Sequence, residues 1–224
     1  SLKDMHFDAP TSKWGYADDV TLDDFARKVG RLSQSGQPFF ATMLTLSSHE
    51  PFDVPYDKFE DRMLNSMAFT DECLHNWIER MKRTPAWDNL LVIIVADHSY
   101  SYPYNISNAV PERYRIPMLW TGGAVRGPQV IDTYASQTDL AATLLEQMGL
   151  PHDDFRFSRD IMCPEVPHFG YFTFNNGFGV VDSAGATVFD CTTQRVISPD
   201  STAWQLKAGM AILQTTYKSI REMH

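Results

Sequence analysis

The chain has 224 residues, of which 43% are hydrophobic and 21% charged, the composition of a globular protein that can bury a core. Its formal net charge of -9 argues against a role in which Lys and Arg neutralise phosphates, so no nucleic-acid partner is expected. No run reaches the roughly 20 apolar residues of a membrane span. Three scattered cysteines, Cys73, Cys163 and Cys191, fit no zinc spacing and no disulfide framework, and each is expected to be structural.

The first predicted elements are a helix and a strand. Apolar residues recur with a helical period over 22–32, and Asp19 or Thr21 is expected to cap this helix. A buried strand is expected over 39–46, ending in the loop that contains His49.

A second helix is expected over 63–81, ending before Pro85 because proline restricts the residue that precedes it. Its predicted core face comprises Met63, Met67, Thr70, Leu74, Trp77 and Met81. Strands are then expected over 90–95 and 116–120, followed by a helix over 136–148. That helix should begin with a capping box of Ser136 and Asp139, bury Leu140, Leu144, Leu145 and Met148, and end at Gly149.

After residue 168 the pattern changes to β-branched and aromatic residues, with a hairpin signal at Asn176-Gly177. It predicts an antiparallel meander of about four strands, covered by a last helix. The apolar face of that helix is Leu206, Met210, Leu213, Tyr217 and Ile220. The predicted fold class is therefore α/β: a layered mixed or parallel sheet with flanking helices over 1–165, and a small meander-plus-helix subdomain over 166–224.

The segment LVIIVADHSY places Asp97 and His98 directly after a predicted buried strand. Open α/β sheets bind ligands at the carboxyl ends of their strands, and His49 follows its own predicted strand at the same kind of position. If the two strands are parallel neighbours, the three side chains meet in one crevice. Carboxylate and imidazole together suit a divalent metal such as zinc or manganese.

Two ligands do not make a metal site, so a hydrogen-bonded Asp-His turn pair stays an open alternative. His168 and Arg113 are further candidates for the crevice. The remaining histidines, His6, His75, His152 and His224, have no neighbours in the sequence that suggest chemistry.

Four segments in this order resemble the sulfatase-like branch of the alkaline phosphatase superfamily: PFFATMLTLSSHEPFDVP, DNLLVIIVADHS, RIPMLWTGG and SQTDLAATLLEQMGL. The nearest resemblance is to phosphoglycerol transferases of the lipoteichoic-acid-synthase type, in the C-terminal part of their catalytic domain. WGYADDVTLDDFARKV is also similar to the segment that precedes the first of these strands.

The resemblance implies that Asp97 and His98 bind a divalent metal and that His49 contacts the phosphate or glycerol of the substrate. Manganese is the expected ion, with zinc, magnesium or calcium as alternatives, held weakly or not at all by this chain alone. The implied substrate is a phospholipid or glycolipid head group, and the implied location is the extracytoplasmic face of a bacterial membrane, as a domain of a larger membrane protein of the cell envelope.

The nucleophile of the family has no match in this chain. It is a threonine, or a modified cysteine or serine in sulfatases, and it is expected before Ser1 together with a further acidic metal ligand. Thr42, Thr45, Ser47 and Ser48 do not match its motif. We therefore expect the isolated chain to be inactive without a missing N-terminal half. Two alternatives to phosphoglycerol or phosphoethanolamine transfer are a sulfate ester hydrolase and a non-catalytic binding module.

Overall fold

The computed structural model describes residues 7–223, so His6 and His224 lie outside the described residues. The chain forms two units, each with its own internal contacts. The first contains the residues up to Ile93 together with Leu119–Gly127, and the second contains Ile94–Met118 and the residues from Pro128 onward. The division at residues 165 and 166 stays a prediction.

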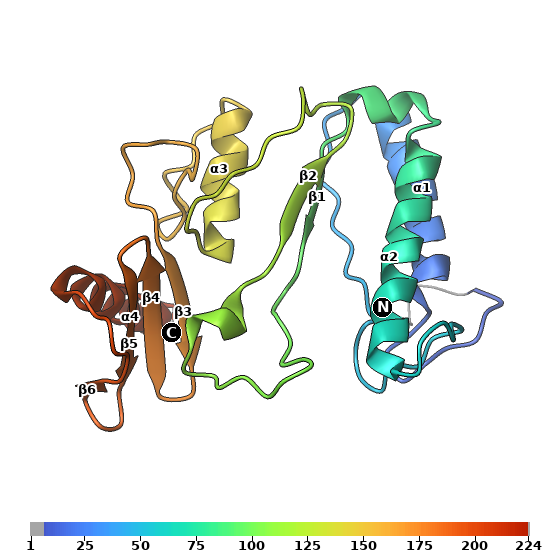
Figure 1. Cartoon of the computed structure of the whole chain (residues 1–224). Helices are drawn as coiled ribbons and strands as arrows, with labels where there is room; N and C mark the ends of the chain where they lie inside the picture. Colours follow the sequence, from blue (N-terminus) through green and yellow to red (C-terminus); the bar gives the residue numbers. More distant parts are fainter. Residues whose placement is uncertain (1–6, 224) are drawn as a thin grey trace. The chain divides into compact units, whose positions relative to one another are not determined.

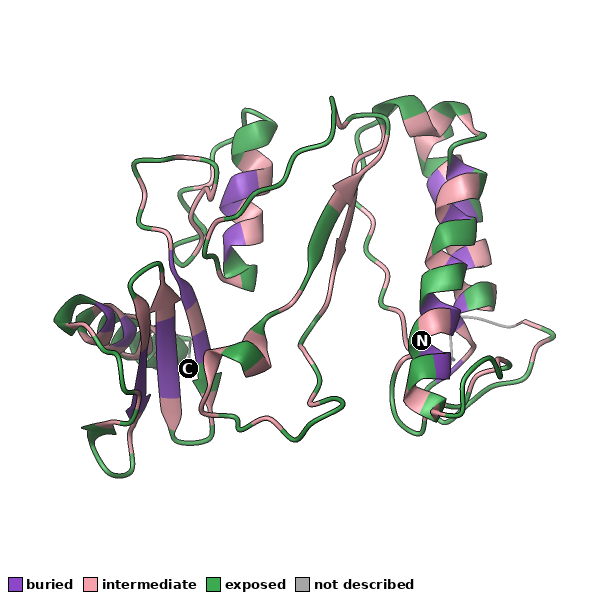
Figure 2. Cartoon of the chain, viewed as in Figure 1, coloured by how far each residue is buried: buried purple, intermediate pink, exposed green. Residues whose placement is uncertain are grey.

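In the first unit, helix α1 (Asp18–Gln34) packs along helix α2 (Arg62–Met81), as Figure 1 shows. Their facing sides, purple in Figure 2, form the core: Leu22, Ala26, Val29, Phe69, Cys73, Trp77 and Met81. The predicted helix over 22–32 is confirmed, but the expected caps are wrong. The helix begins at Asp18 with Ala17 as its N-cap, so Asp19 and Thr21 lie inside the first turn and cannot cap it.

Helix α2 begins at Asp61, whose carboxylate accepts the amides of Met63 and Leu64, and it ends before Pro85 as predicted. One part of its predicted core face is wrong, because the side chain of Met67 is 40% exposed. Thr70 is buried as predicted, and the polar residues Asn65 and Ser66 are buried as well. Each has a hydrogen-bond partner, which removes the main cost of burying it.

The strand expected over 39–46 is absent from the described structure. Phe40 is 86% exposed there, and Leu44 is also exposed. A strand exists only where a neighbouring strand satisfies its amides and carbonyls, and no described strand pairs with this segment. Strands do form at Val92–Val95 (β1) and Met118–Thr121 (β2), which pair in a two-stranded sheet. The 3-10 turns η1 (Pro85–Asn89) and η2 (Pro111–Tyr114) precede them.

In the second unit, η3 (Gln137–Asp139) leads into helix α3 (Leu140–Gln147), and the predicted capping box of Ser136 and Asp139 is confirmed. The predicted apolar face is wrong in part: Met148 is 59% exposed, whereas Ala142 and Thr143 are buried. The cause is the Thr143 hydroxyl, which donates to the Asp139 carbonyl and accepts the Ile161 amide, so this side of the helix faces the loop after it.

The meander is confirmed as a four-stranded antiparallel sheet in sequence order: β3 (Gly170–Phe174), β4 (Gly177–Asp182), β5 (Gly185–Asp190) and β6 (Arg195–Val196). Helix α4 (Ala203–Glu222) covers one face of it (Figure 1). Tyr217 and Ile220 do not join that core and are exposed. A helix of 20 residues is about 30 Å long, and a strand of six spans only about 20 Å, so the last turns of α4 extend past the sheet. Within residues 7–223, no helix combines the length and the apolar character that a membrane crossing requires.

Candidate functional site

Asp97 and His98 follow β1 directly, and their side chains face one another. Asp97 Oδ2 lies 3.7 Å from His98 Nε2, and both side chains are largely exposed. The other carboxylate oxygen, Oδ1, accepts the backbone amide of His98 at 2.9 Å, which fixes the rotation of the carboxylate. One oxygen and one ring nitrogen therefore point to the same volume of solvent.

The protonation of the His98 ring follows from its other nitrogen. Nδ1 lies 2.8 Å from the carbonyl oxygen of Ser99. Because a carbonyl oxygen only accepts hydrogen bonds, Nδ1 is the donor in this contact, and in the neutral ring Nε2 therefore has the lone pair. This is the arrangement of most metal-binding histidines, whose second nitrogen donates to a carbonyl or carboxylate.

Arg113 braces the same turn. Its Nη1 donates to the carbonyl of Ser99 at 2.6 Å and to the Ser99 hydroxyl at 2.9 Å, and that hydroxyl donates to the Arg113 carbonyl. The carbonyl of Ser99 thus accepts from both His98 and Arg113. Arg113 thus contacts the residue after His98, while its place in the predicted crevice stays a prediction. His168 instead bonds the Cys163 carbonyl at 3.0 Å.

The end of β1 is held from the other side by Gln137. Its amide nitrogen donates to the carbonyl of Ala96 at 2.7 Å and is 3.4 Å from that of Asp97. Gln137 lies in the capping box, between Ser136 and Asp139, so whatever fixes this box also fixes the turn that carries the Asp-His pair.

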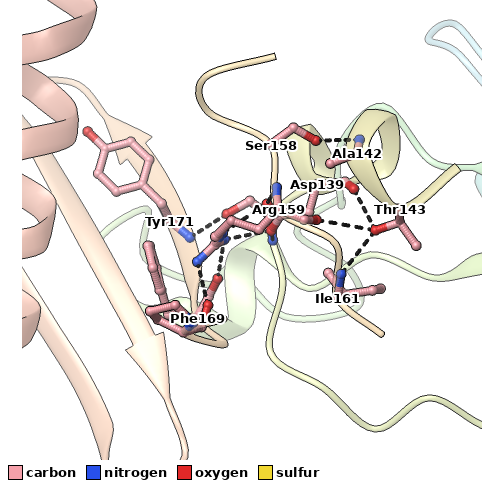
Figure 3. Close-up of polar contacts among 10 residues, drawn as sticks. Asp139, Ala142, Thr143, Ser158, Arg159, Ile161, Phe169 and Tyr171 are labelled. Carbon is pink, nitrogen blue, oxygen red and sulfur yellow. Dashed lines mark hydrogen bonds and ion pairs between the residues drawn. The ribbon is translucent and has the colours of Figure 1, made fainter. Parts of the chain in front are cut away.

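A buried ion pair fixes the capping box (Figure 3). Asp139 is 1% exposed, and the guanidinium of Arg159 binds it through two nitrogens, at 3.0 Å to Oδ1 and 2.6 Å to Oδ2. Arg159 also donates to the carbonyls of Pro167 and Phe169 and stacks 3.7 Å above the Phe169 ring. This network connects the start of α3 to the start of β3.

His49 belongs to the first unit, in a turn after residue 46. Its Nδ1 lies 2.9 Å from the carbonyl of Glu50, so Nδ1 is the donor here too, and in the neutral ring Nε2 has the lone pair. The indole of Trp14 lies against the ring, with centroids 4.2 Å apart. Because Asp97 and His98 belong to the second unit, a common crevice of all three residues stays a prediction.

The donors present fit a divalent ion. Two ligands on one tetrahedral ion with bonds of about 2.1 Å lie about 3.4 Å apart, close to the separation of Asp97 Oδ2 and His98 Nε2. The described residues supply only these two ligands, because no group of three His, Cys, Asp or Glu side chains within 7–223 surrounds a common point. Asp97 and His98 would hold a metal together with donors from elsewhere.

Four residues that brace the candidate site were missed or misread from the sequence. Asp139 is assigned to helix capping alone, Arg159 carries no motif, and Gln137 and Trp14 are noted only within longer similar segments. The signal for Asp139 and Arg159 was a pair of charges in a stretch that otherwise buries apolar residues, but their pairing joins positions 20 residues apart.

Comparison with known proteins identifies relatives along most of the chain. The family model described as Sulfatase matches residues 3–150. The chain is 28% identical over 169 residues to Phosphoglycerol transferase I of Xanthomonas axonopodis pv. citri, which covers 70% of this chain and 24% of that protein. It is 24% identical over 227 residues to the lipoteichoic acid synthase-like protein YvgJ of Bacillus subtilis, covering 87% and 35%. The chain therefore spans about a quarter to a third of the length of these relatives.

Two solved structures share the fold. A protein of the alkaline phosphatase superfamily from Vibrio parahaemolyticus superposes with a TM-score of 0.80 at 21% identity, covering 99% of this chain and 58% of the other. The lipoteichoic acid synthase LtaP of Listeria monocytogenes gives 0.69 at 16%, covering 92% and 60%. Both confirm the alkaline-phosphatase-like α/β fold that the sequence predicts.

Proposed function

Because the chain belongs to the sulfatase family, we propose that it is part of a metal-dependent enzyme that transfers phosphoglycerol or phosphoethanolamine from a lipid head group. The observation that carries the proposal is the convergence of Asp97 Oδ2 and His98 Nε2, with the proton of His98 held on Nδ1 by the Ser99 carbonyl. The printed names of the relatives, phosphoglycerol transferase and lipoteichoic acid synthase, favour a phosphodiester over a sulfate ester as the substrate.

Each site residue has a separate role in this proposal. Asp97 and His98 hold the ion, while Gln137 and Arg113 keep their turn in place through the main-chain carbonyls of Ala96 and Ser99. When bound, a divalent ion such as manganese stabilises negative charge on phosphoryl oxygens and lowers the pKa of an attacking hydroxyl. His49 Nε2 first takes up a proton through its lone pair, and the protonated ring then donates a hydrogen bond to a phosphoryl or leaving-group oxygen and transfers that proton there.

The nucleophile in this proposal is a threonine that precedes Ser1 in the whole protein, where a further acidic metal ligand also lies. The threonine hydroxyl gives up its proton to His49, its oxygen forms a bond to phosphorus as the bond from phosphorus to the lipid oxygen breaks, and the lipid oxygen takes up that proton. An alcohol or water then receives the group. Residues 1–165 form part of the catalytic domain, 166–224 a subdomain, and the whole enzyme works at the extracytoplasmic face of a bacterial membrane.

Metal binding is the first test. The full-length protein is titrated with Mn²⁺, and binding is measured by the loss of the electron paramagnetic resonance signal of the free ion. Asp97→Asn and His98→Ala should each have a lower affinity for Mn²⁺ than the parent. His75→Ala removes an exposed imidazole of α2 and serves as the matched control, with unchanged affinity. Equal affinity in the parent and both site variants would exclude Asp97 and His98 as ligands.

The substrate class is decided with the full-length protein in the presence of Mn²⁺. Release of diacylglycerol from phosphatidylglycerol or phosphatidylethanolamine vesicles, lost in His98→Ala, supports the proposal. Hydrolysis of nitrophenyl sulfate without turnover of either lipid would instead identify a sulfate ester hydrolase. Metal binding without turnover of any of the three would favour a binding module.

A further inference from the structure

The imidazole of His49 is held by a residue far away in the sequence. The rings of Trp14 and His49 lie 4.2 Å apart between centroids, with their planes inclined by 51°. The Trp14 indole N–H and the His49 Nδ1–H both donate to the carbonyl oxygen of Glu50. A carbonyl oxygen has two lone pairs and can accept both hydrogen bonds. The imidazole is therefore fixed by a ring contact and by an acceptor that it shares with its neighbour.

Trp14 does not behave as a core residue. Its side chain is 40% exposed, whereas tryptophan is highly buried on average, and it is not a member of the core formed by α1 and α2. The ammonium group of Lys13 lies 5.1 Å from its ring centroid, a contact that needs an accessible ring face. Trp14 and His49 therefore form a pair of aromatic rings at the protein surface and are not part of the hydrophobic interior.

The same short segment also holds the base of the His49 loop. The carboxylate of Asp18 is buried, and it accepts the backbone amides of Leu46 and Ser47 and the hydroxyl of Thr70. In return, the Ser47 hydroxyl accepts the amide of Asp18 at 2.9 Å. Asp18 thus fixes the start of the loop, and Trp14 fixes its tip.

We propose that Trp14 is a positioning residue that keeps His49 in the Nδ1–H tautomer, so that Nε2 is free to contact the polar head group of the substrate. Free histidine in water favours the opposite tautomer, with the proton on Nε2. Removing the indole exposes the His49–Glu50 hydrogen bond to water and frees the rotation of the imidazole, so the proton redistributes. The substrate contact of Nε2 rests on the proposed function, whereas the tautomer does not.

The tautomer is measured first, in the 224-residue chain without ligand. At a pH where the imidazole is neutral, long-range ¹H–¹⁵N spectra should show the parent His49 protonated on Nδ1. Trp14→Ala should shift the tautomer population of His49 towards Nε2–H. Trp14→Phe keeps a ring but no indole N–H, and it should give an intermediate result. Tyr217→Ala removes an exposed aromatic ring of α4 and should leave His49 unchanged. The amide shifts of Leu46 and Ser47 report whether the loop base is intact.

The kinetic consequence is measured in the full-length protein. For phosphatidylglycerol, Trp14→Ala should lower kcat by on the order of tenfold, part of the 10²–10⁴ that proton transfer contributes, and change KM much less. An unchanged His49 tautomer in Trp14→Ala, with intact loop amides, would overturn the positioning role. Failure of the parent protein to turn over lipid would overturn the proposed function, while the tautomer measurement would still decide the role of Trp14.

Discussion

Replacing Arg159 with methionine should destabilise the second unit by about 3 kcal/mol. The variant leaves the Asp139 carboxylate buried without its partner, and breaking a buried pair in this way typically costs about 3–5 kcal/mol. The lower end applies here because the Arg159 side chain is one-fifth exposed, so water can reach part of the site. The backbone amides at positions 136 and 159 do not depend on the side chain at position 159, so both still donate to the Asp139 carboxylate in the variant.

The assay is urea unfolding followed by far-UV circular dichroism, together with hydrogen exchange at the Tyr171 amide. That amide donates to the Ser136 hydroxyl at 2.8 Å, so its exchange responds to loosening of this network (Tyr171 in Figure 3). Arg159→Lys keeps the charge but loses the two-pronged geometry, and should lie between the parent and Arg159→Met. A loss under about 1 kcal/mol, with unchanged Tyr171 exchange, would refute the reasoning, because the ion pair would then only offset its own desolvation.

Three further predictions concern local packing, the ionisation of a buried thiol and metal binding. Gly209→Ala should destabilise the protein by about 1–3 kcal/mol, since the new methyl group would lie 2.1 Å from the Phe178 ring. Gly30→Ala in α1, where the new methyl group meets open space, should stabilise the protein by about 0.5–1 kcal/mol. Thermal unfolding measures both changes. Burial raises the pKa of the Cys73 thiol from 9.0 to about 12, so its alkylation at pH 8 should be slow. The unfolded chain loses this proton at a lower pH than the folded chain, so the free energy of unfolding should fall as the pH rises from about 9 through 12. The fall should be smaller in Cys73→Ala. A Cys73 thiol that iodoacetamide modifies as fast as an unfolded control would contradict this. Arg113→Met should weaken Mn²⁺ binding about 10- to 100-fold, and an unchanged affinity would mean that Arg113 only stabilises its own loop.

Helices and hairpins were predictable because their signals are local. The periodic apolar residues of α1 and α4, the capping box at Ser136, and the hairpin turn at Asn176 each depend on residues within a few positions. The faces were predicted less well. Apolar periodicity placed Met67 and Met148 inside, but satisfied polar residues such as Thr143 occupy the interior, and this depends on partners far away in the sequence.

The expected strand over 39–46 shows the limit of an apolar run as evidence. Such a run is equally compatible with a strand and with an unpaired segment, because the ladder of hydrogen bonds is made by a second strand and not by the run itself. Phe40 is largely exposed to solvent because no described strand or helix covers this segment. In the apolar run 90–95, Val92–Val95 form β1 because β2 pairs with them.

The two site histidines share a feature that no sequence motif records. His49 and His98 each donate from Nδ1 to the carbonyl of the next residue, and each of these carbonyls accepts a second hydrogen bond from a distant donor. Those donors are Trp14, 36 residues from Glu50, and Arg113, 14 residues from Ser99. The acceptors are main-chain atoms, although the Ser99 hydroxyl also binds Arg113 and helps to place it. The sequence therefore indicates which residue types lie at the candidate site, whereas the hydrogen bonds that orient each imidazole depend on which distant donor the fold brings to the carbonyl.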